Sequence, residues 1–182
     1  MAPAGNFESL QAAIDNGADS VYFGVDQLNM RARASINFTI ADLDEIARRC
    51  APKGIRTYLT LNTIIYDHDL SIIKTLLDAA KKAGLTAVIA MDQAVIAYAR
   101  QIGMEVHIST QINITNIETV RFYAMFADTM VMSRELSLRQ IKKICEQIEK
   151  EQIKGPSGNL VEIEIFGHGA LCMAVSGKCY LS

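Results

Sequence analysis

The sequence predicts an α/β fold, an incomplete (β/α)8 barrel of the TIM type with parallel strands. Short apolar runs rich in Val, Ile, Tyr and Thr alternate with amphipathic helical patterns along the whole chain. The alternation repeats at a period of roughly 20–35 residues, which is typical of successive βαβ units in a parallel sheet. A doubly wound nucleotide-binding sheet is the alternative, but the sequence contains neither G-x-G-x-x-G nor G-x-x-x-x-G-K-[ST], which disfavours it.

Seven strands are expected. The first is the short "MAP" at the start of the chain, because it leads directly into a helix at Asn6. The other six are the apolar runs at 20–25, 56–62, 86–91, 105–109, 128–133 and 161–166. A complete barrel has eight strands and about 250 residues, whereas this chain has 182 residues. We therefore expect a single domain over residues 1–182, with the last strand or strands outside this chain.

The segments between the strands carry the pattern of helices with one apolar face. Apolar or small residues recur at i, i+3, i+4 and i+7 in four segments, beginning at Leu10, Leu43, Ile73 and Ile141. Residues that favour a helix start precede several of these segments, namely Asn6, Asp92 and the capping-box patterns Thr39-x-x-Asp42, Thr115-x-x-Glu118 and Ser137-x-x-Gln140. Glycines suited to helix ends follow four patterns, at Gly17, Gly54, Gly84 and Gly103.

Composition narrows the functional classes. The 18 basic and 20 acidic residues give a net charge of -2, unlike the strongly basic profile of a typical nucleic-acid module, although a local patch leaves an RNA partner open. No apolar run approaches the roughly 20 residues that span a bilayer, and the start lacks the pattern of a secretory signal, so we expect no membrane partner. Four cysteines in a chain of this size favour a reducing, cytoplasmic setting in which paired cysteines serve metal or redox chemistry.

Polar side chains gather where the predicted strands end. They are Asn62, Asp92, Gln93, Ser109, Gln111, Asn113, Arg134, Glu135 and His168. The carboxyl ends of parallel strands share one edge of the sheet, where barrel enzymes build their sites. Arg31 and Arg33, in the loop at 26–38, could reach the same edge.

Structural alternatives exist for several of these residues, since βα-loops are polar in every such fold. Asp92 and the cluster Asp67-His68-Asp69 suit helix caps as well as chemistry. Arg134 and Glu135 could form a structural ion pair. His107 lies within a strand pattern and suits a hydrogen-bonded core position.

The stretch "EIFGHGALCMAVSGKCYLS" at 164–182 concentrates further chemistry. Cys172 and Cys179 could bind a metal or cluster, and His168 would complete three ligands for a catalytic zinc. Cys172 and His168 could instead form a nucleophile pair. A third possibility is that the small residues and buried cysteines only pack a turn. The C-x6-C spacing alone leaves all three open.

The motif Glu164-x-Phe166-x-His168-Gly169-Ala170-Leu171-Cys172-x4-Gly177-x-Cys179-x-x-Ser182 resembles the signature of the collagenase-like peptidase family (peptidase class U, family thirty-two). The resemblance extends to "APAGNFESLQAAIDNGADSVYFG" at 2–24, "NF" at 37–38, "HISTQ" at 107–111 and "SREL" at 133–136, and so covers essentially the whole chain.

This resemblance implies an incomplete or modified barrel and a four-iron four-sulfur cluster. Cys172 and Cys179 match the first two cluster cysteines, and the other two lie further downstream in the family, so we expect no cluster on this chain alone. Cys50 and Cys145 fall on predicted outer helices and are poor substitutes.

Within the family, activities are divided between a collagen-degrading peptidase and hydroxylation of tRNA wobble uridine, a ribosomal RNA base or the ubiquinone ring. "SRELSLRQIKKI" with the terminal motif is most similar to the RNA-hydroxylation branch. We therefore expect an iron–sulfur-dependent RNA hydroxylase, with a metal-dependent or thiol protease or ubiquinone-ring hydroxylation as alternatives. The expected proton carriers are Glu135, Glu164 and His168. The expected substrate-binding residues are Arg31, Asn62, Ser109, Gln111 and Arg134. The strand edges of an unclosed barrel also predict self-association.

Overall fold

The computed structural model describes residues 1–25, 38–168 and 174–177. The chain divides into two compact units, residues 1–105 (unit 1) and residues 106–181 (unit 2). The assignment of residues 1–182 to one domain stays a prediction. Three residues expected in the functional site, Arg31, Cys172 and Cys179, lie outside the described residues.

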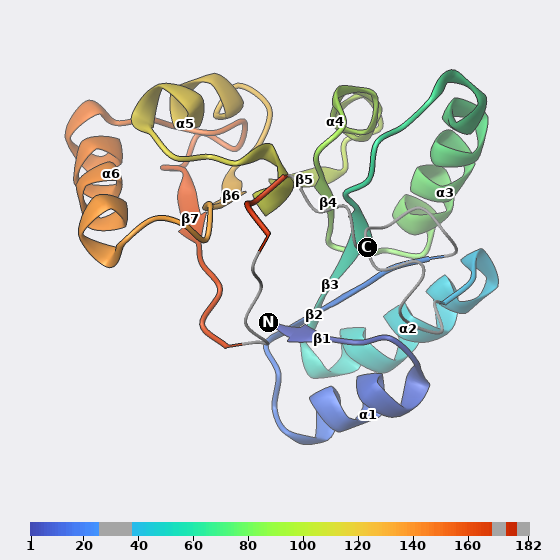
Figure 1. The fold of residues 1–182 in the computed structure, drawn as a ribbon. Helices are drawn as coiled ribbons and strands as arrows, with labels where there is room; N and C mark the ends of the chain where they lie inside the picture. The colour runs from blue at the N-terminus through green and yellow to red at the C-terminus, as the bar shows by residue number, and fades with distance from the viewer. Residues whose placement is uncertain (26–37, 169–173, 178–182) are drawn as a thin grey trace. The chain divides into compact units, whose positions relative to one another are not determined.

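Unit 1 contains four parallel strands that pair in chain order, each followed by a helix (Figure 1). The strands are β1 (Ala2–Pro3), β2 (Ser20–Phe23), β3 (Arg56–Leu61) and β4 (Ala87–Ala90). The α-helices are α1 (Phe7–Asp15), α2 (Leu43–Cys50), α3 (Leu70–Lys82) and α4 (Gln93–Gln101). Short 3-10 turns adjoin them, η1 (Ile40–Asp42), η2 (Ala51–Lys53) and η3 (Asp67–Asp69).

The core of unit 1 forms between its strands and the apolar faces of its helices. Strands β3 and β4 pair from Tyr58 with Ala87 to Leu61 with Ala90, and every residue of β4 is buried. Helix α3 buries Ile73, Leu76, Leu77 and Ala80, which is the face that the sequence predicts. Burial of a leucine or isoleucine side chain contributes about 1.5–3 kcal/mol, so this face fixes α3 against the sheet.

Unit 2 continues the strand–helix alternation. Its parallel strands are β5 (Glu105–Ile108), β6 (Thr129–Val131) and β7 (Glu162–Glu164), with His107 paired to Thr129 and Met130 to Ile163. Its helices are the 3-10 turn η4 (Thr110–Ile112), α5 (Ile117–Tyr123) and α6 (Leu138–Glu151). Met130, Ile144 and Ile148 are buried in its core.

The predicted fold class is confirmed. Seven short strands lie within the seven predicted segments, and those that pair within a unit are parallel, as an incomplete (β/α)8 barrel requires. Asn6 and Asp92 cap α1 and α4, and the boxes at Thr39 and Ser137 are formed. The four predicted end-of-helix glycines all take positive φ.

The predicted helix start at Thr115 is wrong by one residue. Helix α5 is capped by Asn116, whose Oδ1 accepts hydrogen bonds from the N–H of Thr119 at 3.0 Å and from its hydroxyl at 3.2 Å. Asparagine is a stronger N-cap than threonine, so the neighbouring residue takes the position.

None of the helices in the described part of the chain is long and apolar enough to cross a lipid bilayer.

Candidate functional site

Most of the expected site residues lie at the carboxyl ends of the strands of unit 2, and a short turn at 174–177 contacts three of them, Gln111, Arg134 and Glu135. Ser109 and Gln111 follow β5, Arg134 and Glu135 follow β6, and Glu164 ends β7. In unit 1, the half-buried Asn62 follows β3 directly.

Arg134 binds the turn at 174–177 with its side chain and its backbone. Its Nη2 donates a hydrogen bond to the carbonyl of Ala174 at 3.1 Å. Its backbone N–H and its Nε both donate to the Oγ of Ser176, at 3.3 and 3.4 Å. The planar guanidinium can serve two acceptors at once, so it orients this turn as well as attracting it.

Glu135 binds the same turn through its carboxylate. The backbone N–H of Ser176 donates to Oε1 at 2.6 Å, and the hydroxyl of Ser133 donates to Oε2. Burial alone would raise the pKa of Glu135, but the hydrogen bonds from Ser133 and Ser176 outweigh it and lower this pKa to about 2. Glu135 is therefore an ionised acceptor near neutral pH.

Gln111 supplies the third attachment of this turn. Its Oε1 accepts a hydrogen bond from the N–H of Gly177 at 3.1 Å. Gly177 has a φ of +77°, and a Cβ there would overlap the carbonyl oxygen of Gln111. The close approach of the two backbones therefore requires glycine.

Neighbouring hydroxyls fix the loop that carries Gln111. Ser109 is buried and caps η4, where its Oγ accepts from the N–H of Gln111 at 3.3 Å. The hydroxyl of Thr110 donates to the carbonyl of Met132 at 3.2 Å. These bonds give Ser109 a structural task, and a contact of Ser109 with substrate stays a prediction.

Glu164 and His168 are the other expected proton carriers. Glu164 Oε2 lies 4.0 Å from Nδ1 of His107, which is buried in β5 as the sequence predicts for a core position. His168 is exposed, four positions after the end of β7. Both side chains remain candidates for proton transfer.

Two polar groups of unit 1 have structural tasks. Asp92 Oδ1 accepts from the N–H of Ala94 at 2.8 Å, which confirms it as the cap of α4, and its Oδ2 accepts from Ile65 at 3.4 Å. In the cluster at 67–69, Asp69 Oδ2 accepts from the N–H of Tyr66 at 3.0 Å, and the exposed His68 ring stacks on Tyr66. The capping interpretation of both is therefore confirmed.

Sequence analysis missed Ser133 and Ser176, the two serines that complete this site. Ser176 is only 1% exposed, and its Oγ and N–H meet Arg134 and Glu135. The signal was weak, because a serine between small residues is common in any loop. Their positions directly before "RE" and within the C-x6-C stretch are the only clues.

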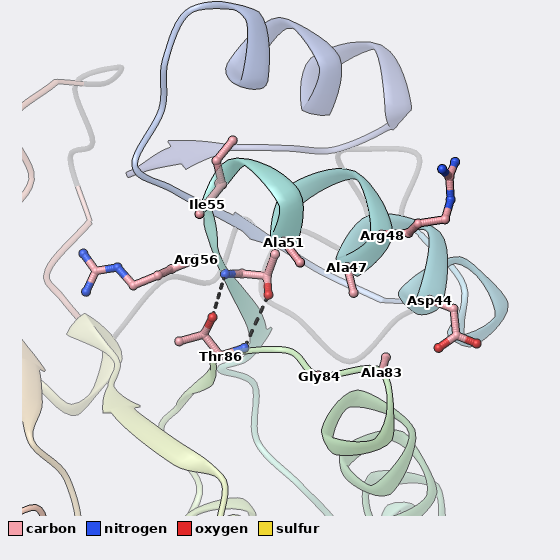
Figure 2. Close-up of a pocket in the computed structure, with 11 residues that line it drawn as sticks. Asp44, Ala47, Arg48, Ala51, Ile55, Arg56, Ala83, Gly84 and Thr86 are labelled. Atoms are coloured by element: carbon pink, nitrogen blue, oxygen red, sulfur yellow. Dashed lines mark hydrogen bonds between the residues drawn. The ribbon is translucent and has the colours of Figure 1, made fainter.

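One hollow on the surface of unit 1 lies away from the expected chemistry (Figure 2). It has a volume of about 570 Å³ and lies beside the first residues of β3, Arg56 and Thr57, and beside Thr86, which precedes β4. Thr57 N–H donates to Thr86 Oγ1, and Thr86 N–H donates to Thr57 O, both at 3.0 Å (Figure 2). Barrel enzymes build their sites at the opposite, carboxyl edge of the strands, so we assign no chemistry to this hollow.

The described side chains do not form a metal centre by themselves. Across residues 1–25, 38–168 and 174–177, no three His, Cys, Asp or Glu side chains come together as a metal site would require. Cys50 is buried in α2 and Cys145 lies on α6, and burial raises the pKa of both thiols, with Glu149 adding to the shift at Cys145. Protonated thiols are poor ligands. Cys172 and Cys179 lie outside the described residues, and their role as ligands of a four-iron cluster stays a prediction.

Comparison of this sequence with known proteins finds a family whose profile matches nearly the whole chain. The sequence profile of peptidase family U32 matches residues 5–182. A collagenase of Porphyromonas gingivalis is 57% identical over all of this chain and 44% of its own length. The tRNA hydroxylation protein P1 of Bacillus subtilis is 33% identical over all of this chain and 41% of its own length. The chain thus spans less than half the length of these relatives.

A solved structure supports the fold. The U32 peptidase Mk0906 superposes with a TM-score of 0.66, over 81% of this chain and 64% of that protein, at 13% identity. At this identity the likeness concerns the fold alone.

Proposed function

This chain belongs to peptidase family U32, and on that premise we propose that it functions in RNA hydroxylation with a four-iron four-sulfur cluster. The proposed substrate is a tRNA wobble uridine or a ribosomal RNA base. The observation that carries the proposal is the turn at 174–177, which lies between Cys172 and Cys179 in the sequence and is bound to the carboxyl-edge residues of β5 and β6.

The thiols of Cys172 and Cys179 would hold one side of the cluster, and the other two ligands would come from residues outside this sequence. When bound, such a cluster supplies one-electron transfer. The tRNA hydroxylation protein P1 matches all of this chain, and this similarity supports an RNA substrate.

Proton transfer is better assigned to Glu164 and His168 than to Glu135. A proton carrier works best when its pKa lies near the working pH, whereas the pKa of Glu135 is lowered to about 2. Glu135 and Arg134 therefore serve this site by binding the turn at 174–177. Substrate contacts by Asn62, Ser109 and Arg31 remain part of the proposal.

The direct test is nucleoside mass spectrometry of tRNA and ribosomal RNA from a strain that lacks the gene. We expect one hydroxylated nucleoside to disappear and its precursor, lighter by one oxygen atom, to accumulate. An unchanged nucleoside profile would remove the RNA assignment.

The cluster is tested separately by anaerobic purification of the full-length protein. A brown protein with about four irons per chain is expected, as a four-iron cluster requires. A colourless, iron-free preparation under these conditions would contradict the cluster assignment.

A protease is the second candidate, because the collagenase-named relative is 57% identical to this chain. It predicts cleavage of denatured collagen that a chelator or Cys172→Ser abolishes. Cleavage that survives both treatments, or no cleavage by the pure protein, would remove this candidate.

Self-association through open strand edges also stays a proposal. Light scattering at increasing concentration tests it, and a constant monomer mass would count against it.

A further inference from the structure

We propose that His107 is a positioning residue for proton transfer, because its buried imidazole orients the carboxylate of Glu164 at the carboxyl edge of unit 2. The inference rests on the proposed function, in which Glu164 carries a proton at the reaction site. The contact itself does not depend on that function, since Nδ1 of His107 lies 4.0 Å from Oε2 of Glu164.

Strand register places the two side chains on one face of the sheet. His107 in β5 pairs with Thr129 in β6, and Thr129 pairs with Glu162 in β7. Paired residues of parallel strands point to the same face, and so do residues two positions apart on one strand. Glu164 stands two positions after Glu162 and therefore shares the face of His107. The contact between the two side chains crosses β6.

The pair connects the interior of unit 2 with its surface. The side chain of His107 is 5% exposed, whereas that of Glu164 is 26% exposed. Burial of an imidazole costs free energy unless polar groups face its nitrogens, and Glu164 places a carboxylate on the Nδ1 side. Of the two side chains, Glu164 is the one that a substrate can reach. His107 must therefore act through Glu164.

The imidazole can hold the carboxylate through a proton on Nδ1. An ionised carboxylate only accepts hydrogen bonds, and a protonated ring nitrogen of histidine donates one. The 4.0 Å separation is longer than a hydrogen bond, but catalytic hydrogen bonds often tighten only when the substrate binds. In the proposed step, one proton passes from the substrate to the carboxylate of Glu164, and His107 keeps its own proton throughout.

Two substitutions of His107 separate positioning from packing. His107→Asn keeps an N–H donor on a short side chain, whereas His107→Leu replaces the ring by apolar atoms and has no donor. If His107 only packs the core, leucine is the better replacement, because burial of a polar amide costs stability. The positioning role predicts the reverse order, with His107→Asn more active than His107→Leu.

The activity is read as the rate at which the hydroxylated nucleoside appears in RNA after the gene is induced in the deletion strain. We expect His107→Leu to lower this rate by about tenfold or more, because small misplacements of a reacting group are costly. In a Glu164→Gln background, His107→Leu should cause no further loss, since residues that act as a unit are not additive. Glu162→Gln removes the same charge from an exposed residue of β7 and should leave the rate unchanged.

Nuclear magnetic resonance of the histidine rings tests the contact without RNA or turnover. In the purified protein with ¹⁵N-labelled histidine, the ring signals that disappear in His107→Asn belong to His107. These signals should shift in Glu164→Gln and stay in place in Glu162→Gln. Urea unfolding of each variant shows whether it is folded. Should His107→Leu fail to fold, the comparison of Glu164→Gln with Glu162→Gln decides the question.

A folded His107→Leu protein as active as His107→Asn would overturn the positioning role, as would His107 ring signals that are the same in Glu164→Gln and the unmodified protein. Failure of the proposed function gives a different result. RNA nucleosides unaffected by gene deletion, together with His107 signals that shift in Glu164→Gln, would remove RNA hydroxylation and leave the link between His107 and Glu164 intact.

Discussion

Replacing Gly177 by alanine should release the turn at 174–177 without changing any charge. The Cβ would overlap the carbonyl oxygen of Gln111 and lie 3.4 Å from its carbonyl carbon. Gln111 belongs to η4, whose backbone is held by Ser109 and Thr110, so the overlap cannot be relieved by rotating a side chain. The turn must move instead, which breaks the bond from Gly177 N–H to Gln111 Oε1.

Gly158→Ala is the matched control for this change. Gly158 also lies in unit 2 and has a φ of +83°, close to the +77° of Gly177, but a Cβ there meets nothing within 4 Å. Both substitutions carry the backbone cost of positive φ in an L-residue, about 1–2 kcal/mol. Only Gly177→Ala adds steric overlap, which typically costs about 1–3 kcal/mol.

Amide hydrogen exchange gives the local free energy of opening at Ser176, whose N–H is bound by Glu135. In Gly177→Ala this amide should exchange at least roughly fivefold faster than in Gly158→Ala, which corresponds to a difference of about 1 kcal/mol or more. Equal exchange in the two variants would falsify the close contact between the turn and Gln111.

The remaining predictions concern acid, helix caps and the edge of unit 1. The pKa of Glu135 falls from 4.5 to about 2 on folding, so its bond to Ser176 contributes fully to stability above about pH 4.5 and is lost as the pH falls toward 2. Amide hydrogen exchange at Ser176, measured relative to the Glu135→Gln variant, should therefore accelerate as the pH falls from 4.5 to about 2. Asn116→Ala should lower the free energy of unfolding by about 1 kcal/mol in urea denaturation, whereas Thr115→Ala should change it by less than about 0.5 kcal/mol, and the reverse order would contradict the assigned cap. Asp92→Ala should lower the free energy of unfolding by about 1–2 kcal/mol, because the cap of α4 and the bond to Ile65 are lost. RNA hydroxylation should remain, and its loss in a folded variant would show that Asp92 has a chemical role.

The fold was predictable because it depends on patterns that are local in sequence. The spacing of Ile73, Leu76, Leu77 and Ala80 defines a helical face, and all four are buried. The capping box at Ser137 depends on residues three positions apart. The pattern Thr115-x-x-Glu118 predicts a helix start at Thr115, but Asn116 caps α5 in the structure, and spacing alone does not decide between two adjacent residues that can both cap a helix.

The site was predictable only in part, because its contacts join residues distant in sequence. Arg134 and Glu135 were correctly expected at the carboxyl edge, but their bonds to Ser176 span 42 and 41 positions. Gln111 and Gly177 are 66 positions apart. No periodicity relates such pairs, so the sequence indicated which residues are polar at this edge and not what they bind.

Complementation of the deletion strain tests the central claim most directly. A gene with Cys145→Ser should restore the hydroxylated nucleoside in RNA, because the thiol of Cys145 on α6 has a pKa raised by burial and by Glu149 and suits no ligand role. A gene with Cys172→Ser should produce folded protein and leave the nucleoside unhydroxylated. Restoration of the hydroxylated nucleoside by Cys172→Ser would contradict the assignment of this chain to thiolate-bound, cluster-dependent RNA hydroxylation.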